Sequence, residues 1–309
     1  MVDKKFGAIL IPDWLGNVDE MGVALGPKVL YNTVIKSKKL IFGEPIAAYI
    51  TDCVEIPFLE PKRVDYLSST RAKYFSEIDT IQLRICDEIK AMINCRKIPI
   101  IFLGDDSSLV GTISGFISVY GSQNLGVLYC DAHADLNTPD TTRTGKVYGM
   151  PLGFLMHLQG HTMKCNEVLQ PLTGRNIYML GQRAFDPIEL PLILDLEIPH
   201  ASSDEINSSN YLADDIVDYF KYNGIENLFL HVDADVIDPA ENPGVVIPEN
   251  YGANLSNLLR ILWDVALMTN VAGLSISEFV PRLDVDCKTR NNMAMIVESV
   301  IESIVSRRV

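Results

Sequence analysis

The chain has 309 residues, of which 48% are hydrophobic and 21% charged, and its formal net charge is −14. This length fits one large α/β domain or two smaller ones, and the composition is that of a globular protein. The acidity of the chain, with a pI of about 4.8, argues against a nucleic-acid binder, which would need a basic face to contact phosphates. No apolar run reaches the ~18 residues of a membrane helix, and the apolar run at residues 6–11 is too short for a signal peptide. We therefore expect neither nucleic acid nor a membrane as a partner.

The six cysteines include no CxxC pair. In a chain of this length we interpret them as reduced thiols, several of which lie in apolar patterns and act as small hydrophobes. This interpretation predicts a cytoplasmic protein.

Short, β-rich apolar runs alternate with longer helical patterns along the chain. Strands are expected at 6–11, 45–50 (the weakest), 98–103, 126–130, 176–180, 227–232 and 273–277, and helices at 69–94, 253–268 and 293–304. Strands that are apolar on both faces suit a sheet covered by helices on each side, and the alternation predicts a parallel sheet. With no repeat or linker, a single domain over residues 1–309 is the simplest interpretation. Sites in such sheets lie at the carboxyl ends of the strands.

Acidic residues follow four of the expected strands. FLGDDSS contains Asp105 and Asp106, YCDAHAD contains Asp131, His133 and Asp135, LHVDADVIDP contains His231, Asp233, Asp235 and Asp238, and SISEF contains Glu278. Strand alternation predicts that Asp131, His133 and Asp135 share one side, as do His231, Asp233 and Asp235. One Asp after a strand is usually a helix cap or a turn former. Several carboxylates in a poorly solvated pocket repel one another unless a cation lies between them, and carboxylates with one or two imidazoles suit Mn²⁺ or a similar ion. The combined pattern therefore favours a metal centre, in which two bridged ions would hold and deprotonate a water.

Several segments, in this order, resemble those of the ureohydrolases, the family of arginase and agmatinase. GVALGPKVL (22–30) is similar to the family's GxxxGP start of the first helix. LGDDSS stands in the place of GGDHS, DAHADLNTP matches DAHxDxNTP, VDADVIDP matches DVDxxDP, and SISEFVPRLD is similar to ExNPxxD. The resemblance implies a three-layer α/β/α sandwich with a parallel, eight-stranded sheet. It also implies hydrolysis of a guanidine or amidine C–N bond by a metal-activated water, and a homo-oligomer, trimeric or hexameric.

The resemblance also implies roles for the acidic residues. Asp131 and Asp233 would bridge two Mn²⁺ ions. Asp135 would complete the shell of the first ion, and His133 and Asp235 would bind the second. Glu278 would pair with a substrate guanidinium through a charge-assisted bidentate contact, whereas Asp238 would support its turn.

A loop after the second motif resembles the one that separates arginases from agmatinases. NTPDTTRTG is similar to the arginase segment NTPxTTxSG, so Asn137 and Thr144 look like groups that hold an α-carboxylate. In GQRAFDPIE, Asp186 and Glu189 resemble the pair that holds an α-ammonium. The loop favours a small guanidino substrate with an arginine-like α-amino acid end. The alternative is a well-ordered turn without this role.

Two positions depart from the family pattern at the expected metal centre and pocket. The GGDHS histidine, which binds the first metal, is replaced by Asp106. Asp106 either ligates a hard cation, giving two ions, or only caps the following helix, leaving one. The family's pocket histidine is replaced by Tyr148, whose ordinary pKa of about 10 makes it a poor proton shuttle at neutral pH. Tyr148 either orients substrate or packs at the pocket rim.

Two further departures involve His231 and Val245. His231 replaces a small residue and either compensates as a metal ligand or is a buried, hydrogen-bonded histidine. We favour the second interpretation, because it lies about 6–7 Å back along the strand from Asp233. Val245 replaces a threonine that faces the guanidine in arginases, so a modified or larger substrate is an alternative to arginine.

These observations support two hypotheses and leave a third open. The first is a metal-dependent amidinohydrolase that releases urea or a substituted urea from arginine or an arginine-like α-amino acid, with Glu278, Asp135 and Tyr148 as catalytic residues and an atypical first metal site. The second is a catalytically impaired homologue that acts as a binding or regulatory protein. The third is a related hydrolase that acts on a non-guanidine amide or imine.

Overall fold

A computed structural model describes residues 5–18, 20–57 and 71–307. The strands are β1 (Lys5–Ile11), β2 (Leu40–Ile41), β3 (Glu44–Pro45), β4 (Ile50–Glu55), β5 (Lys97–Leu103), β6 (Leu125–Cys130), β7 (Ile177–Leu180), β8 (His200–Ala201), β9 (Asn227–Asp233) and β10 (Val271–Ser277). The α-helices are α1 (Gly26–Ile35), α2 (Phe75–Asn94), α3 (Leu109–Tyr120), α4 (Pro151–Leu155), α5 (Glu189–Asp195), α6 (Ser203–Ser208), α7 (Leu212–Tyr222), α8 (Leu255–Met268) and α9 (Lys288–Ser306).

Eight of the strands form one sheet in the order β4-β1-β5-β10-β9-β6-β7-β8, and they pair in parallel. The four strands in the middle of this order are β5, β10, β9 and β6. They are the strands that the acidic motifs follow in the sequence. The topology therefore brings motifs that are far apart in the chain to adjacent strand ends.

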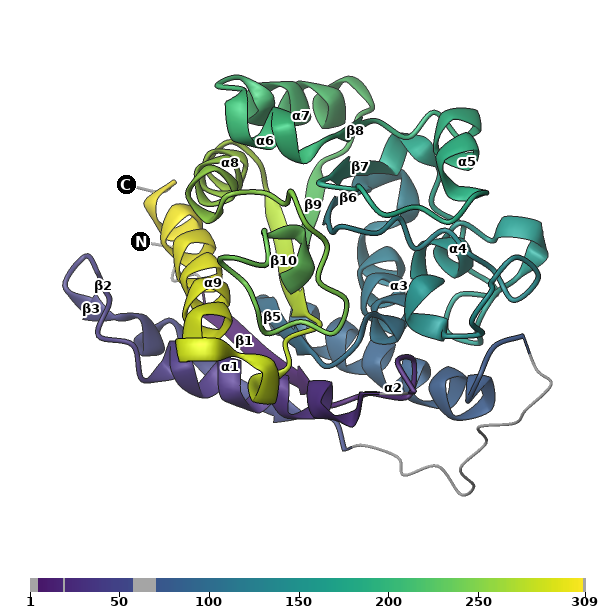
Figure 1. Ribbon diagram of the computed structural model, residues 1–309. Helices are drawn as coiled ribbons and strands as arrows, with labels where there is room; N and C mark the ends of the chain where they lie inside the picture. Colours follow the sequence, from purple (N-terminus) through teal and green to yellow (C-terminus); the bar gives the residue numbers. More distant parts are fainter. Residues whose placement is uncertain (1–4, 19, 58–70, 308–309) are drawn as a thin grey trace.

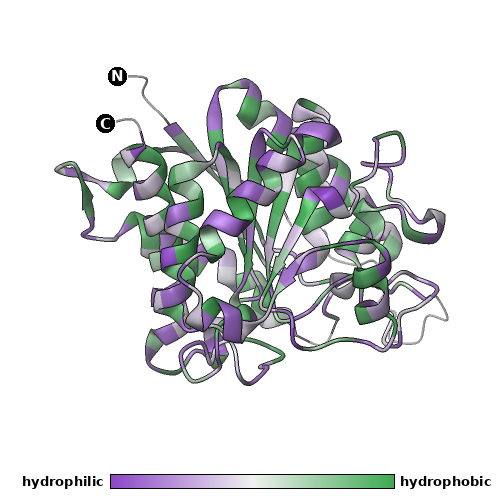
Figure 2. Cartoon of the chain, turned by 90° about the horizontal axis from the view of Figure 1, so that it is seen from above, coloured by the Kyte–Doolittle hydropathy of each residue, from purple (hydrophilic) through white to green (hydrophobic). Residues whose placement is uncertain are grey.

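Helices cover both faces of the sheet (Figure 1). One hydrophobic core lies between the sheet and α1, α6, α7, α8 and α9, and the other between the sheet and α2, α3, α4 and α5. Figure 2 shows hydrophobic strands at the centre of the molecule and hydrophilic colour mainly on the surrounding helices and loops. The expected three-layer α/β/α sandwich with eight parallel strands is confirmed. Among the described residues, no helix is long and apolar enough to cross a membrane.

The strand expected at 45–50 is wrong over most of its length. Glu44–Pro45 instead pairs antiparallel with Leu40–Ile41, Ile46–Ala48 forms a 3₁₀ turn, and β4 begins only at Ile50. β4 was missed because it is an edge strand whose side chains are mostly exposed, so its sequence lacks the apolar run of a central strand. The two-residue strand β8 was also missed.

The three expected helices are present with shifted bounds. α2 begins at Phe75 rather than at 69, and residues 69 and 70 lie outside the described part of the chain. The helix expected at 293–304 is the middle of α9, and that expected at 253–268 is α8. α3 has no polar stripe because Leu109 to Ile117 are buried throughout, so periodicity could not mark it.

Candidate metal centre

The ends of β5, β10, β9 and β6 surround a narrow inner cavity of about 20 Å³. Its lining residues are Asn17, Asp106, Asp131, His133, Asp135, Tyr148, Asp233, Asp235, Val245, Val246, Ile247 and Glu278. Every residue predicted from the sequence to bind metal is in this set. The predicted guanidinium partner Glu278 and the two pocket substitutions Tyr148 and Val245 are in it as well.

The turn after β5 gives its two neighbouring aspartates different positions. Asp105 is the N-cap: its Oδ1 accepts from Ser107 N at 3.0 Å, and its Oδ2 accepts from Asn17 N at 3.0 Å. Burial and the charge of Asp13 raise the pKa of Asp105 to about 7. The carboxylate of Asp106 is left free of capping and lines the cavity. The interpretation of Asp106 as only a helix cap is therefore wrong, because the preceding residue takes that role.

The loop after β6 brings Asp131 and His133 to the cavity without strand geometry. β6 ends at Cys130, so the expected strand alternation does not apply to residues 131–135. Asp131 Oδ1 accepts from His133 N at 2.6 Å, and His133 Nδ1 lies 3.1 Å from Asp235 Oδ2. Asp131, His133 and Asp235 each offer a ligand atom within 4.8 Å of the others.

Asp135 and Glu278 reach the cavity through left-handed backbone conformations. Their φ angles are +54° and +58°, a region that is unfavourable for residues other than glycine and that is common at functional sites. Asp135 Oδ2 accepts from Tyr129 Oη at 2.5 Å, and Glu278 Oε1 accepts from Asp106 N at 3.2 Å. Both carboxylates are thereby held in one orientation.

Burial, and after it the crowding of carboxylates, dominates the electrostatics of the cavity. Burial, followed by the charge of Asp235, raises the pKa of Asp131 to about 6. Burial and neighbouring carboxylates also raise the pKa values of Asp135, Asp233 and Glu278 well above their ordinary range. This repulsion is what a divalent cation would remove.

His133 and Asp235 are an oppositely charged pair, in which each partner favours the charged form of the other against the effect of burial. Burial alone would lower the pKa of His133, but Asp235 and Asp131 raise it well above its ordinary value. Burial alone would raise the pKa of Asp235, but His133 lowers it.

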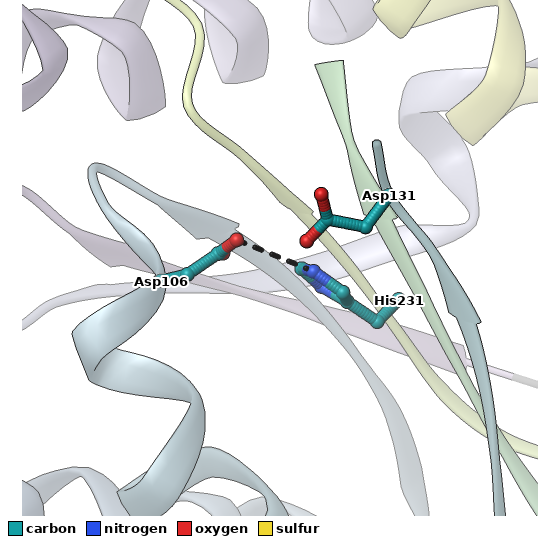
Figure 3. A group of neighbouring side chains, drawn as sticks. All are labelled: Asp106, Asp131 and His231. Carbon is teal, nitrogen blue, oxygen red and sulfur yellow. Dashed lines mark ion pairs between the residues drawn. The ribbon is translucent and has the colours of Figure 1, made fainter. Parts of the chain in front are cut away.

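A second group of metal-ligating side chains consists of Asp106, Asp131 and His231, whose ligand atoms also lie within 4.8 Å of one another. Figure 3 shows the His231 ring directed toward the Asp106 carboxylate, with Asp131 beside it. His231 Nδ1 lies 2.9 Å from Ser275 Oγ. The expected buried, hydrogen-bonded histidine is confirmed, but its ring also reaches the group of candidate metal ligands, which strand distance alone did not indicate.

An outer pocket of about 230 Å³ continues from the inner cavity and shares His133, Asp135, Tyr148 and Ile247 with it. The four residues predicted to hold an α-amino acid, Asn137, Thr144, Asp186 and Glu189, line this pocket. Asn137 Nδ2 donates to Asp186 Oδ2 at 2.9 Å and to Glu189 Oε1 at 3.3 Å. Glu189 Oε2 also accepts from Asp186 N at 2.8 Å. These contacts join the two loop segments, although they are distant in the sequence.

Of two further residues near the inner cavity, Asp238 was assigned its role from the sequence and Asn17 was not. Asp238 supports its turn as expected, accepting from Ala240 N at 3.0 Å and Gly252 N at 3.1 Å. The sequence interpretation missed Asn17, which follows β1 and lines the inner cavity. Its signal was weak: β1 also ends at this edge of the sheet, but an amide in a turn is common. All six cysteines are free, as expected.

A model of the arginase family matches residues 8–302. The chain belongs to the arginase family. An arginase from Bacillus subtilis is 26% identical over 307 residues, which cover 97% of this chain and 98% of the relative. A crystal structure of arginase from Bacillus subtilis matches with a TM-score of 0.84 at 23% identity and covers 96% of this chain and 98% of that one. A formimidoylglutamase from Bacillus subtilis matches with a TM-score of 0.78 at 18% identity, covering 98% and 88%.

The family match confirms the resemblance drawn from the motifs, and the chain is a homologue of the arginase-family hydrolases. The donor set fits the family's divalent metal: buried carboxylates and imidazoles converge, and Asp106 Oδ1, Asp131 Oδ2 and His231 Nε2 lack hydrogen-bond partners. Buried polar atoms are rarely left unpaired, so these atoms are available to a cation.

Proposed function

We propose that this arginase-family protein is a metal-dependent amidinohydrolase that cleaves the guanidino C–N bond of arginine or an arginine-like α-amino acid. The products would be an ornithine-like amino acid and urea or a substituted urea. The observation that carries the proposal is the continuity of the acidic inner cavity with an outer pocket that contains Asn137, Thr144, Asp186 and Glu189. A guanidinium and an α-amino acid group lie at opposite ends of one such molecule.

The proposed metal ligands are Asp106, Asp131, His133, Asp135, Asp233 and Asp235, of which Asp131 and Asp233 would bridge two Mn²⁺ ions. When bound, the metal would supply an activated water and Lewis acidity for hydrolysis of the guanidino group. We expect two ions if Asp106 ligates and one ion otherwise.

The chain's own groups position the substrate. The buried Glu278 carboxylate faces the inner cavity and accepts hydrogen bonds from the guanidinium. Burial and the charge of Glu278 raise the pKa of Tyr148 above its ordinary value, so its phenol remains protonated and donates a hydrogen bond. In the outer pocket, Asp186 and Glu189 attract the α-ammonium, and Asn137 and Thr144 hold the α-carboxylate.

We also propose a cytoplasmic homo-oligomer, trimeric or hexameric.

Two alternatives rest on specific substitutions. Asp106 and Tyr148 in place of the family histidines favour a catalytically impaired binding or regulatory homologue. Val245 is buried and lines the inner cavity, where it offers no hydroxyl to a guanidine. This favours a related hydrolase for a non-guanidine amide or imine.

Manganese-loaded protein should be assayed with L-arginine, N-substituted arginines, agmatine and N-formimidoyl-L-glutamate, with urea and ammonia measured separately. We expect urea or a substituted urea from an α-amino guanidino compound. Glu278→Gln should lower kcat/KM at least about hundredfold, because it removes a charged contact to the reacting group, while metal content is unchanged. Turnover of formimidoylglutamate alone would favour the third hypothesis. Full metal content without any turnover would favour the binding homologue.

A further inference from the structure

We propose that His231 is the imidazole ligand of the first metal site, where it works together with Asp106 and Asp131. In this arrangement the ligand type that is missing at position 106 is supplied from β9 instead. The inference rests on the metal centre of the proposed function but not on its substrate.

The sheet register fixes the His231 ring between two neighbouring strands. His231 pairs with Tyr129 on β6 and with Ser275 on β10, and register partners project from the same face of a parallel sheet. The Tyr129 and His231 rings lie 4.7 Å apart at 40°. The small Ser275 leaves room for the imidazole on the other side, so the ring extends along the face toward Asp106.

The hydrogen bond of His231 leaves the correct nitrogen for a metal. Nδ1 lies 2.9 Å from Ser275 Oγ, and when Nδ1 donates this bond the neutral ring presents the lone pair of Nε2. Metal-bound histidines commonly donate their second ring nitrogen in this way, which fixes the tautomer. His231 is 0% exposed, and its Nε2 has no hydrogen-bond partner.

Each of the three side chains of this group carries an unpaired buried atom. These atoms are His231 Nε2, Asp106 Oδ1 and Asp131 Oδ2, in side chains whose ligand atoms lie within 4.8 Å of one another. Burial of such atoms without a partner is unfavourable. One cation between them would satisfy all three.

A protonated His231 that only pairs with Asp106 is the main competing explanation. The distance from His231 Nε2 to Asp106 Oδ2 is 3.6 Å, which is longer than the roughly 2.7–2.9 Å of a direct charge-assisted hydrogen bond. It leaves the two atoms apart but directed at the same space (Figure 3). This spacing suits two ligands of one ion better than a donor and its acceptor.

The two departures from the family pattern explain each other under this proposal. The family has a histidine where this chain has the shorter Asp106, and a small residue where this chain has His231. A ring from β9 enters the space that an aspartate at 106 leaves open. The exchange keeps one imidazole and preserves the bridging Asp131.

The test is anomalous diffraction at the manganese edge from crystals of the wild-type protein equilibrated with Mn²⁺, together with metal content per chain. We expect two peaks, one of them within about 2.5 Å of His231 Nε2, a bonding distance for a metal–imidazole contact. A single peak at His133, or a second peak that does not contact His231, would overturn the inference. With a single ion at His133, the proposed function could still operate with one metal. Failure of this inference is therefore distinguishable from failure of the proposed function.

Variants provide an independent readout of metal affinity. His231→Ser should weaken the first site at least about tenfold and leave the His133 site intact, whereas the double variant Asp106→His, His231→Ser should restore two ions per chain. His200→Gln, at an exposed histidine, is the matched control and should not change metal content. Wild-type affinity at both sites in a folded His231→Ser protein would show that His231 is structural.

Discussion

Arg183 stabilises the wall of the inner cavity through its guanidinium. Nη2 donates to Asp235 O at 2.6 Å and Glu249 O at 2.8 Å, Nη1 donates to Gly181 O and Val236 O, and Nε donates to Asn250 O. One side chain thus ties the loop after β7 to both ends of the segment that carries Val245 and Ile247. Nothing in GQRAFDPIE marks this role, because the acceptors are backbone carbonyls.

We predict that Arg183→Met destabilises the protein by about 2–4 kcal/mol, because five hydrogen bonds from a charged group are lost while the apolar stem is kept. Urea unfolding should show a lower midpoint at an unchanged m value. Arg175→Met is the control, since Arg175 is exposed and, within the described part of the chain, its guanidinium donates one hydrogen bond, to Asn223 O. This variant should change stability by less than about 0.5 kcal/mol. Equal effects of the two variants would contradict the role of Arg183.

At the scale of elements, the short helix α4 positions the loop that carries the metal and substrate residues. The first-turn Leu152 N and Gly153 N approach Asp135 O at 3.1 and 3.3 Å. The lack of a side chain at Gly153 lets α4 pack against the Asn137 backbone: an ideal Cβ at Gly153 would lie 2.2 Å from Asn137 O. The helix and the loop therefore fix each other, and both pockets depend on the contact.

Gly153→Ala should destabilise the fold by about 1–3 kcal/mol, the usual effect of overpacking, despite the better helix propensity of alanine. It should also raise KM more than it lowers kcat, because Asn137 moves in the outer pocket. Thermal unfolding and steady-state kinetics measure the two effects. Gly149→Ala is the stability control, since an ideal Cβ there meets no atom closer than 4.0 Å. Equal stability losses in both variants would disprove the packing argument.

At the scale of the whole molecule, buried carboxylates repel one another at the edge of the sheet where the strands have their carboxyl ends. Asp233 is buried, and burial and the charges of Asp235, Asp131 and Asp106 all raise its pKa. Such groups favour function at a cost in stability. This repulsion should therefore lower the free energy of unfolding of the metal-free protein, and metal binding should raise it again.

We predict that Asp233→Asn is at least as stable as wild type in EDTA, since it removes one repelling charge and keeps the oxygen that accepts from Asp235 N at 2.7 Å. With Mn²⁺ at a hundredfold excess over Kd, wild type should gain about 2.7 kcal/mol for each bound ion, or roughly 4 °C in Tm per ion for a chain of this length, whereas the variant should gain much less. Differential scanning calorimetry with and without Mn²⁺ measures both comparisons. A variant that is strongly destabilised in EDTA would show that repulsion at Asp233 is small.

The sequence determined the local part of this structure. Apolar runs predicted six strands of the sheet because buried parallel strands are hydrophobic on both faces, and the clustered acids predicted a metal site because so many buried charges need a cation. The family motifs identified the fold. Edge strand β4 and the fully buried helix α3 were not predicted, because β4 lacks the apolar run of a central strand and α3 lacks a polar stripe.

The tertiary structure decided what depends on neighbours from distant segments. The strand order, which makes β5, β10, β9 and β6 adjacent, results from packing rather than from local preference. The turn after β5 assigned the cap to Asp105 and the cavity to Asp106, two residues of identical chemistry. The direction of the His231 ring was settled by Tyr129 and Ser275 on the flanking strands, since a strand's own sequence fixes which face a side chain occupies but not what it can reach there.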